Sequence, residues 1–164
     1  MSTFYFDGHS AVSDPNTVWS TDSNAFDGNT STAATCGTAG SVSTNFLLGE
    51  GTNATGSGAI FRVDARVFST VSGEKNTNAA IYTDGLGELL GTATRSNAAS
   101  GWGSYVTLTA PASGWTWLAL AELEVKLYAT SITAGNAYPS RVELEVFLLS
   151  ETIPGGFYMR QGWQ

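Results

Sequence analysis

Apolar and charged residues alternate between residues 59 and 71, where the chain reads AIFRVDARVFSTV. A repeat of two residues is typical of a β-strand with one buried face. We expect the apolar series from Phe61 to Val67 to face a core. The outward series comprises Arg62, Asp64, Arg66 and Phe68. Opposite charges along an outer face suit a half-solvated antiparallel sheet.

Residues 141–149, which read RVELEVFLL, alternate in the same way. We expect the aliphatic residues from Val142 to Leu148 to face the core, and Phe147 to be the exception to the alternation. The outward charged residues are Arg141, Glu143 and Glu145. The two segments therefore predict two half-buried strands that contribute to one core.

Turn-forming clusters such as Asp-Gly and Asp-Pro-Asn divide the rest of the chain into short strand candidates. These predicted strands are 3–6, 17–20, 41–49, 78–83, 88–93, 104–109 and 122–129. We expect Phe46 and Leu48 to share one face of their strand. Ala79 and Ile81 should face inward. The apolar residues at 116–121 follow helical spacing, so a single helical turn is predicted there.

These elements predict an all-β fold. About eight or nine short strands with at most one short helical turn favour an antiparallel β-sandwich of jelly-roll type. The alternating faces would supply one core between two sheets. The 164 residues suit a single domain spanning residues 1–164. A chain of this length buries enough surface to need neither a disulfide nor a metal for its core.

The net charge of −7 narrows the range of partners. Nucleic-acid binding depends on Lys and Arg that neutralise phosphates, and anionic membranes attract basic segments. The sequence therefore predicts no nucleic-acid partner and no membrane partner. No apolar run approaches the ~20 residues of a transmembrane helix, and the start MSTFYFDGHS lacks the features of an export signal. We expect synthesis in a cytoplasm.

The side chains offer little catalytic chemistry. His9 is the single histidine, and we expect it in an exposed turn rather than in a catalytic triad. Cys36 has no neighbouring Lys or Arg to activate its thiol, so we expect an inert residue. No Gly-rich phosphate loop links a strand to a helix. The sequence predicts a protein that is not an enzyme and binds no cofactor.

Carboxylates raise two further possibilities, a calcium site and a glycosidase pair. The aspartates in N-terminal turns are Asp7, Asp14, Asp22 and Asp27. They lack EF-hand spacing, and Asp is a common turn former, so we favour turns over a metal site. The glutamates on strands are Glu122, Glu124, Glu143 and Glu145. Cross-strand charge pairing with Lys126 and Arg141 explains them more simply than catalysis.

Aromatic residues beside loops suggest a third kind of site. Exposed flat rings bind sugars, and Trp102 and Trp115 are the candidates for such a platform. Because tryptophan is mostly buried on average, we favour core or subunit contacts for these rings and for Trp117. Sugar binding stays open as the alternative.

The stretch NAFDGNTST, residues 24–32, combines one aromatic with a turn-forming pair. Gly28 is free to adopt a positive φ, and the short polar side chains after it bond nearby backbone groups. We expect Phe26 to be buried as the apolar anchor of this loop. The glycosylation sequons at Asn29 and Asn53 are interpreted as chance matches in a Thr-rich chain.

A family resemblance rests on four stretches in this order: VWSTDSNAFDGNTSTAAT, GSGAIFRVDARVFSTVSG, SGWTWLALAELEVKLYAT and SRVELEVFLL. Over roughly Val18 to Leu149 the chain resembles β-sandwich structural proteins of tailed bacteriophages, of the head-decoration, head-fibre and tail-accessory kind. The resemblance implies a virion-surface protein without an active site, most simply one that decorates the capsid. The DGNT box is also similar to boxes in discoidin-like and other carbohydrate-binding sandwiches, which leaves surface glycans as an alternative partner.

The phage resemblance implies that identical subunits and capsid or tail proteins are the partners. A symmetric homo-oligomer would need an interface, and aromatic residues and Met are enriched at interface cores. The candidates lie near the two ends of the sequence: Phe4, Tyr5, Phe6, Phe157, Tyr158, Met159 and Trp163. The alternative is that both ends complete the sheets of their own domain.

Overall fold

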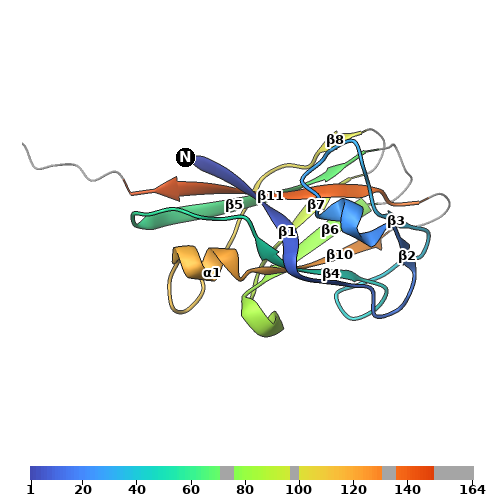
Figure 1. Cartoon of the computed structure of the whole chain (residues 1–164), viewed down its shortest axis with the longest axis horizontal. Helices are drawn as coiled ribbons and strands as arrows, with labels where there is room; N and C mark the ends of the chain where they lie inside the picture. The colour runs from blue at the N-terminus through green and yellow to red at the C-terminus, as the bar shows by residue number, and fades with distance from the viewer. Residues whose placement is uncertain (71–75, 97–99, 131–135, 150–164) are drawn as a thin grey trace, which may run out of the picture.

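The structure is a computed structural model that describes residues 1–70, 76–96, 100–130 and 136–149. Antiparallel strands dominate these residues and confirm the predicted all-β, sandwich-like fold (Figure 1). The strands are β1 (Ser2–Ser13), β2 (Trp19–Ser20), β3 (Thr35–Cys36), β4 (Leu47–Thr52), β5 (Ile60–Ser69), β6 (Asn76–Tyr82), β7 (Leu89–Arg95), β8 (Gly101–Trp102), β9 (Val106–Thr107), β10 (Glu124–Thr130) and β11 (Pro139–Leu148).

Helical structure in the described ranges is limited to three short elements. They are α1 (Trp117–Ala121) and the 3-10 turns η1 (Asp22–Ala25) and η2 (Asp84–Leu86). Within these ranges no helix has the length and apolar character needed to cross a membrane.

The strands form two layers that share β1. The β11 layer contains the N-terminal half of β1, then β11, β5 and the short strands β8 and β9. The β10 layer contains the C-terminal half of β1, then β4, β10, β6 and β7. Because β1 belongs to both layers, one continuous antiparallel sheet folds over onto itself, while β2 and β3 pair separately.

The bend in β1 lies between its two partners. Tyr5 is the last residue of β1 that pairs with β11, and Phe6 is the first that pairs with β4. The register then shifts between Phe6 and Ala11, as in a β-bulge. Gly8 lies in this irregular stretch with a φ of 59°, a conformation that glycine adopts without steric cost.

Beyond the point where β1 turns away from β11, residues 34–36 form hydrogen bonds with the start of β11 and the residues just before it. The Ala34 N–H donates to the Pro139 carbonyl at 3.0 Å, and Cys36 exchanges backbone hydrogen bonds of 3.1 and 2.8 Å with Ala137. The loop that precedes this segment, residues 24–32, therefore lies close to the bend of β1.

The opposite side of the sandwich is closed by the segment that follows β9. The Leu108 N–H donates to the Val63 carbonyl of β5 at 2.9 Å, and the Thr109 N–H donates to the Leu90 carbonyl of β7 at 2.8 Å. These two bonds link the outer strands of the two layers, so the sheet almost closes into a barrel.

The core fills the space between the layers. Val63, Ala65 and Val67 of β5 are fully buried, as the alternation predicts. The other predicted inward residues that are fully buried are Val142, Leu144, Val146, Ala79 and Ile81. Phe61 and Leu148 are exceptions, because they are 64% and 38% exposed. The register between β5 and β11 shifts at this end, so that Leu148 pairs with Ile60 and Phe61 has no partner on β11. Ile60 instead packs against the core.

Phe46 and Leu48 share one face of their segment, as predicted, and that face is the outer one. Leu47 is fully buried, whereas Phe46 and Leu48 are only partly buried. The strand alternates from Leu47, so Leu48 points outward, where it lies opposite Lys126 of β10. Phe46 lies under the Lys126 ammonium, 4.2 Å from the ring centroid. Because three apolar residues follow one another at 46–48, the sequence pattern does not indicate which face of this segment is buried.

The predicted helical turn at 116–121 is confirmed as α1. Thr116 caps it, since its hydroxyl accepts the Ala119 N–H at 3.0 Å. Leu120 is fully buried, and Leu118 on the opposite side of the turn is 67% exposed. Strand β10 follows within a few residues, as the second half of that segment predicts.

The loop 24–32 is anchored as predicted, because Phe26 is only 3% exposed and joins the core. Its ring lies against the backbone of Gly49, where an added Cβ would overlap the ring carbons. Asp27 shapes the turn that follows: one carboxylate oxygen accepts the Asn29 N–H at 2.8 Å, and the other accepts the Thr32 hydroxyl at 2.5 Å.

Candidate ligand-binding face

The outer face of the β11 layer carries the densest group of charged and aromatic side chains that contact one another. We call it face A. Strand register places its residues in rows across β1, β11, β5 and the short strands β8 and β9. The residues of face A are Thr3, Tyr5, Arg62, Asp64, Arg66, Phe68, Trp102, Tyr105, Thr107, Arg141, Glu143, Glu145 and Phe147.

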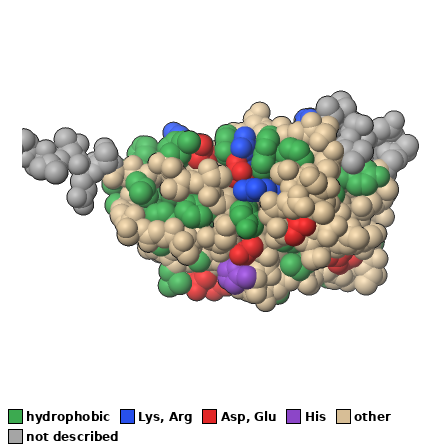
Figure 2. All heavy atoms as spheres, turned by 45° about the horizontal axis from the view of Figure 1, so that its top comes forward, with side chains coloured by type: hydrophobic (Ala, Val, Ile, Leu, Met, Phe, Trp, Pro, Cys, Tyr) green, Lys and Arg blue, Asp and Glu red, His purple; other side chains and the backbone are tan. Residues whose placement is uncertain are grey.

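Figure 2 shows how charge is distributed on the surface. Acidic and basic side chains alternate in a column that rises from the histidine, and hydrophobic side chains lie on both sides of the column. Alternating charges of this kind neutralise one another locally, although the whole chain is strongly acidic.

Glu143 lies at the centre of face A, with a side chain only 7% exposed. Its Oε1 accepts from the Arg66 guanidinium at 2.8 Å (Nε) and 2.6 Å (Nη2), and from the Tyr105 hydroxyl at 2.9 Å. Its Oε2 lies 3.4 Å from Nη2 of Arg141. A carboxylate removed from water needs such partners, and here two arginines and a phenol supply them.

Arg66 is also held between two aromatic rings. Its guanidinium carbon lies 4.1 Å from the centroid of the Trp102 ring and 4.3 Å from that of Tyr105. Trp102 in turn meets Phe68 edge to face, with centroids 5.0 Å apart. Cation–π contacts, together with one carboxylate oxygen that accepts from two guanidinium nitrogens, fix both the position and the plane of the guanidinium.

Arg141 is fixed in a similar way at the other side of Glu143. Its guanidinium carbon lies 4.6 Å from the Tyr5 ring centroid, and Nη1 donates to the Gly28 carbonyl at 3.1 Å. A Cβ on Gly28 would lie 2.8 Å from the Tyr5 ring, so the loop needs glycine at this position for its close approach. The loop 24–32 therefore forms one border of face A.

A second charged group occupies the other end of face A. The Arg62 guanidinium lies 3.9 Å above the Phe147 ring, and its Nε is 3.2 Å from Oδ1 of Asp64. The same Asp64 oxygen accepts the Thr107 hydroxyl at 2.8 Å. Each of the three arginines on face A thus combines an aromatic ring with a carboxylate.

Tyr105 titrates abnormally in this setting. Burial raises the pKa of its phenol to about 12, and the hydrogen bond to Glu143 and the negative charge of that carboxylate act in the same direction. Arg66 opposes the increase, and Glu145 adds to it. The phenol is therefore a hydrogen-bond donor at neutral pH.

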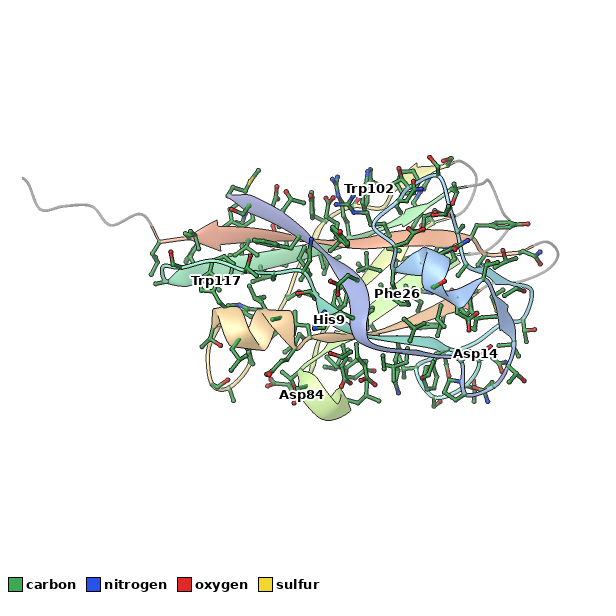
Figure 3. The ribbon with its side chains drawn as sticks, viewed as in Figure 1. His9, Asp14, Phe26, Asp84, Trp102 and Trp117 are labelled. Atoms are coloured by element: carbon green, nitrogen blue, oxygen red, sulfur yellow. The ribbon has the colours of Figure 1, made fainter. Side chains whose placement is uncertain are left out.

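The two tryptophans predicted for a sugar platform do not form one surface. Trp102 belongs to face A, but Trp115 is partly buried against the core beside α1. Trp117, two residues on, lies at the opposite end of the molecule from Trp102 (Figure 3). Its indole N–H donates to the Gly58 carbonyl at 3.0 Å, and its ring meets Phe4 edge to face at 5.8 Å.

The residues predicted for a subunit interface are also separated. Phe6 is fully buried in the core of its own domain, so its assignment to an interface was wrong: β1 is an internal strand, and its inward residues pack under the sheet. Phe4 packs on Trp117, and Tyr5 lies under Arg141 on face A. The remaining candidates lie outside the described residues: Phe157, Tyr158, Met159 and Trp163.

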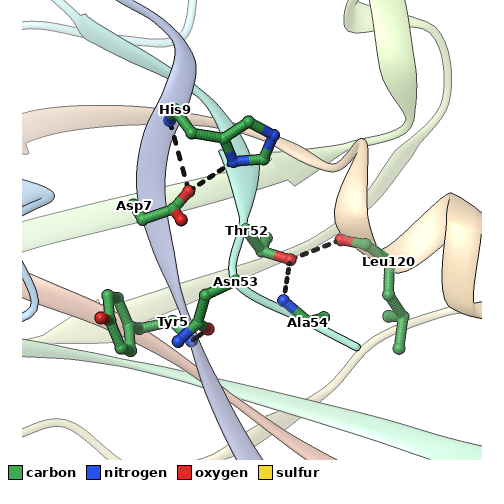
Figure 4. Close-up of polar contacts among 7 residues, drawn as sticks. All are labelled: Tyr5, Asp7, His9, Thr52, Asn53, Ala54 and Leu120. Atoms are coloured by element: carbon green, nitrogen blue, oxygen red, sulfur yellow. Dashed lines mark hydrogen bonds and ion pairs between the residues drawn. The ribbon is translucent and has the colours of Figure 1, made fainter. Parts of the chain in front are cut away.

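His9 is exposed as predicted, with a side chain that is 52% exposed, but it lies in the irregular stretch of strand β1 rather than in a turn. Figure 4 shows its Nδ1 bonded to Asp7 at 2.7 Å, and the ring rests on the backbone of Gly51. In the part of the chain that the structure describes, no Ser, Thr or Cys side chain forms a hydrogen bond with the His9 ring. The nearby Thr52 hydroxyl instead donates to the Leu120 carbonyl at 2.8 Å.

The other carboxylates serve structural roles. Asp14 accepts the backbone N–H groups of Asn16 and Trp19, which confirms a turn role there, as for Asp27. Burial, and then the charge of Asp14, raise the pKa of Asp22. Across residues 1–70, 76–96, 100–130 and 136–149, no three His, Cys, Asp or Glu side chains gather as a metal site would require.

Glu124 departs from the charge pairing predicted for it. Its carboxylate accepts the backbone N–H groups of Gly85 and Leu86, at 2.8 and 2.7 Å, and so holds the turn η2. Lys126 on the same strand donates to the Val42 carbonyl at 2.9 Å. For Glu143 the predicted pairing with Arg141 is present, and Arg66 adds a stronger partner.

Sequence reasoning identified Trp102 but not the residues that surround it. The alternation in β5 and β11 placed Arg66 and Glu143 on outer faces, yet it could not predict that these two strands pair with those residues opposite each other. Tyr105 comes from a short connection whose position depends on the whole sandwich. The missed signal was the repeated Arg and Glu of RVDAR and RVELE.

Comparison with known proteins gives few matches. No protein-family model and no curated protein sequence matches this chain. Among solved structures, the chain is similar to the CBM22-1–GH10 modules of an N-terminal endo-1,4-β-D-xylanase 10B from Clostridium thermocellum, complexed with xylohexaose. The TM-score is 0.46 with 14% sequence identity, over 86% of this chain and 26% of that one.

Proposed function

We propose that this domain is a non-catalytic carbohydrate-binding module and that face A binds a polysaccharide. The observation that carries the proposal is the Arg66 guanidinium, which is held between the Trp102 and Tyr105 rings above a buried carboxylate. Trp102 is partly exposed, so it remains accessible to a ligand. Face A is where the described chain combines such rings with fixed hydrogen-bond donors.

The chemistry of this arrangement suits a sugar. A pyranose ring has apolar C–H surfaces that pack on an aromatic ring and a rim of hydroxyl groups that accept and donate hydrogen bonds. Arg66 and Arg141 present N–H donors in fixed planes, and the carboxylates and hydroxyls of the face supply acceptors. Because the side chains are already held in place, little rotamer entropy is lost when a ligand binds.

A catalytic role has less support from the same residues. Two of the three carboxylates on face A, Glu143 and Asp64, already bond arginine and hydroxyl groups of the protein itself, as structural carboxylates do. His9 contacts Asp7 in the bend of β1 rather than a nucleophile. Binding without chemistry is the simpler proposal.

The test is a binding assay with soluble polysaccharides of uncharged β-glucan, xylan and mannan type, by affinity electrophoresis and then calorimetry. We expect at least one to bind. Trp102→Ala and Arg66→Ala should each weaken that binding about tenfold or more, which corresponds to a loss of about 1.4 kcal/mol. Phe61→Ala is the matched control, since Phe61 is an exposed ring on the same strand as Arg66 but at the end of β5.

Thermal unfolding of each variant separates lost binding from lost structure. If Trp102→Ala and Arg66→Ala keep a cooperative transition and bind as well as Phe61→Ala, face A is not the site. If no polysaccharide binds to the folded wild type, the proposed function is wrong and the Arg–aromatic contacts only stabilise the sheet.

The virion role implied by the phage resemblance stays a separate prediction. It requires a homo-oligomer or attachment to a particle, and it is tested by native mass measurement and by binding to purified capsids or tails. A stable monomer that binds neither particle would contradict it.

A further inference from the structure

We infer that the polysaccharide recognised by face A is uncharged, and that Glu145 is the specificity-determining residue that excludes anionic polysaccharides. This inference rests on the proposed function, because it names the ligand class of the same site. It follows from a contrast on face A: each arginine already contacts a carboxylate, whereas Glu145 has no cationic partner among the described residues.

Each arginine of face A contacts a carboxylate, although Arg66 and Arg141 share one. Arg66 and Arg141 both contact the buried carboxylate of Glu143, with N–O distances of 2.6 and 3.4 Å. Arg62 contacts Asp64 at 3.2 Å. A uronic acid or sulfate group on a ligand would therefore have to compete with existing carboxylates for these arginines, because each arginine already contacts a carboxylate of the protein.

Glu145 is the carboxylate that has no such partner. It lies on the same face of β11 as Glu143, two residues further along, and among the described residues no cation pairs with it. Its cross-strand neighbours are Thr3 of β1 and Asp64 of β5. Like charges opposite each other destabilise a sheet, so a carboxylate beside Asp64 carries a cost in the free protein.

The position of Glu145 is close to the proposed contact residues. Its negative charge acts on the Tyr105 phenol, which lies under the Arg66 guanidinium. A ligand that packs on Trp102 and Tyr105 would therefore pass near a carboxylate whose oxygens are free to accept hydroxyl protons. For an uncharged polysaccharide that contact is favourable, whereas a polymer with carboxylates would meet like charge.

The charge balance supports the same conclusion. Face A carries three arginines and three carboxylates, so its formal charges sum to zero: Arg62, Arg66, Arg141, Asp64, Glu143 and Glu145. The chain around it carries a net charge of −7. An anionic polymer approaching the face is therefore repelled by the protein as a whole, and most directly by Glu145.

The experiment compares one polymer in two charge states. The uncharged polysaccharide that binds best in the panel above is carboxymethylated, and both forms are titrated against wild type, Glu145→Gln and Glu122→Gln. Glu122 is an exposed glutamate at the end of α1, so its variant removes the same net charge away from face A. Thermal unfolding confirms that each variant is folded.

We expect wild type and Glu122→Gln to bind the carboxymethylated form about tenfold more weakly than the uncharged form. Glu145→Gln should reduce this difference to about threefold or less while it retains binding of the uncharged form, because an amide still accepts and donates hydrogen bonds. In about 1 M NaCl, where the Debye length is about 3 Å, the difference should shrink for all three proteins.

Two results would overturn the inference and leave the proposed function in place. One is equal or tighter binding of the carboxymethylated polymer by wild type, and the other is an unchanged ratio in Glu145→Gln. Failure of the folded wild type to bind either form would overturn both proposals together.

Discussion

Phe26 gives the sharpest test of how this sandwich is held together. Its ring is 3% exposed and joins the loop 24–32 to the core, where it lies on the backbone of Gly49 in β4. Phe26→Ala removes the ring and leaves a cavity under the loop. We expect a loss of about 3–5 kcal/mol in the free energy of unfolding, as for other large-to-small core changes.

The opposite change at the same contact tests whether the ring itself sets this cost. Gly49 lies in extended backbone between Val12 and Val125, so an alanine there meets no conformational penalty, but its Cβ would overlap the Phe26 ring. We expect Gly49→Ala alone to cost about 1–3 kcal/mol by overpacking. In a chain that already carries Phe26→Ala, the added methyl enters the cavity and should cost much less.

The two single variants and the double variant form a double-mutant cycle. Urea unfolding is followed by tryptophan fluorescence, because Trp19 is buried in the same core. We expect the double variant to be about as stable as Phe26→Ala, with a coupling energy of about 1–3 kcal/mol. Additive losses would show that the ring and Gly49 do not interact, and a loss below about 1 kcal/mol for Phe26→Ala would show that the anchor is unimportant.

Two further predictions concern a titration and a helix cap. The folded chain keeps the Tyr105 proton up to a pKa of about 12, whereas a free phenol ionises near 10.0, so the free energy of unfolding should fall as pH rises between these values. Tyr105→Phe should make that fall shallower in urea titrations at pH 9 to 12, and an identical slope would contradict the assignment. Thr116→Ala removes the cap of α1 and should cost about 1 kcal/mol, whereas exposed Thr55→Ala, the control, should be neutral; equal stabilities in urea would refute the capping role.

The fold class could be predicted from the sequence because the alternation in two strands was long and unambiguous. Val63 to Val67 and Val142 to Val146 have charged or polar neighbours at almost every second position, which fixes which face is buried. At 46–48 three apolar residues follow one another, so the pattern predicts that Phe46 and Leu48 share a face but not which face is buried. Which residue faces the core was then decided by pairing with β1 and β10, which are distant in sequence.

The candidate face could be predicted only in part. The sequence indicates that Arg66 and Glu143 point outward, but their contact depends on the pairing of β5 with β11, strands separated by about half the chain. Trp102 reaches the face from β8, and Tyr105 from the segment before β9, and both elements are too short for a periodic signal. Strand register and loop position are properties of the assembled sandwich rather than of any one segment.

The sharing of β1 between the two layers also has a consequence for biosynthesis. Ser2 to Tyr5 pair with β11, so these residues leave the ribosome well before the strand that completes their ladder. Contacts of such long sequence separation slow folding. While β11 is still being translated, the N-terminal half of β1 lacks the strand that it pairs with, so this part of the sheet forms only after β11 has been made.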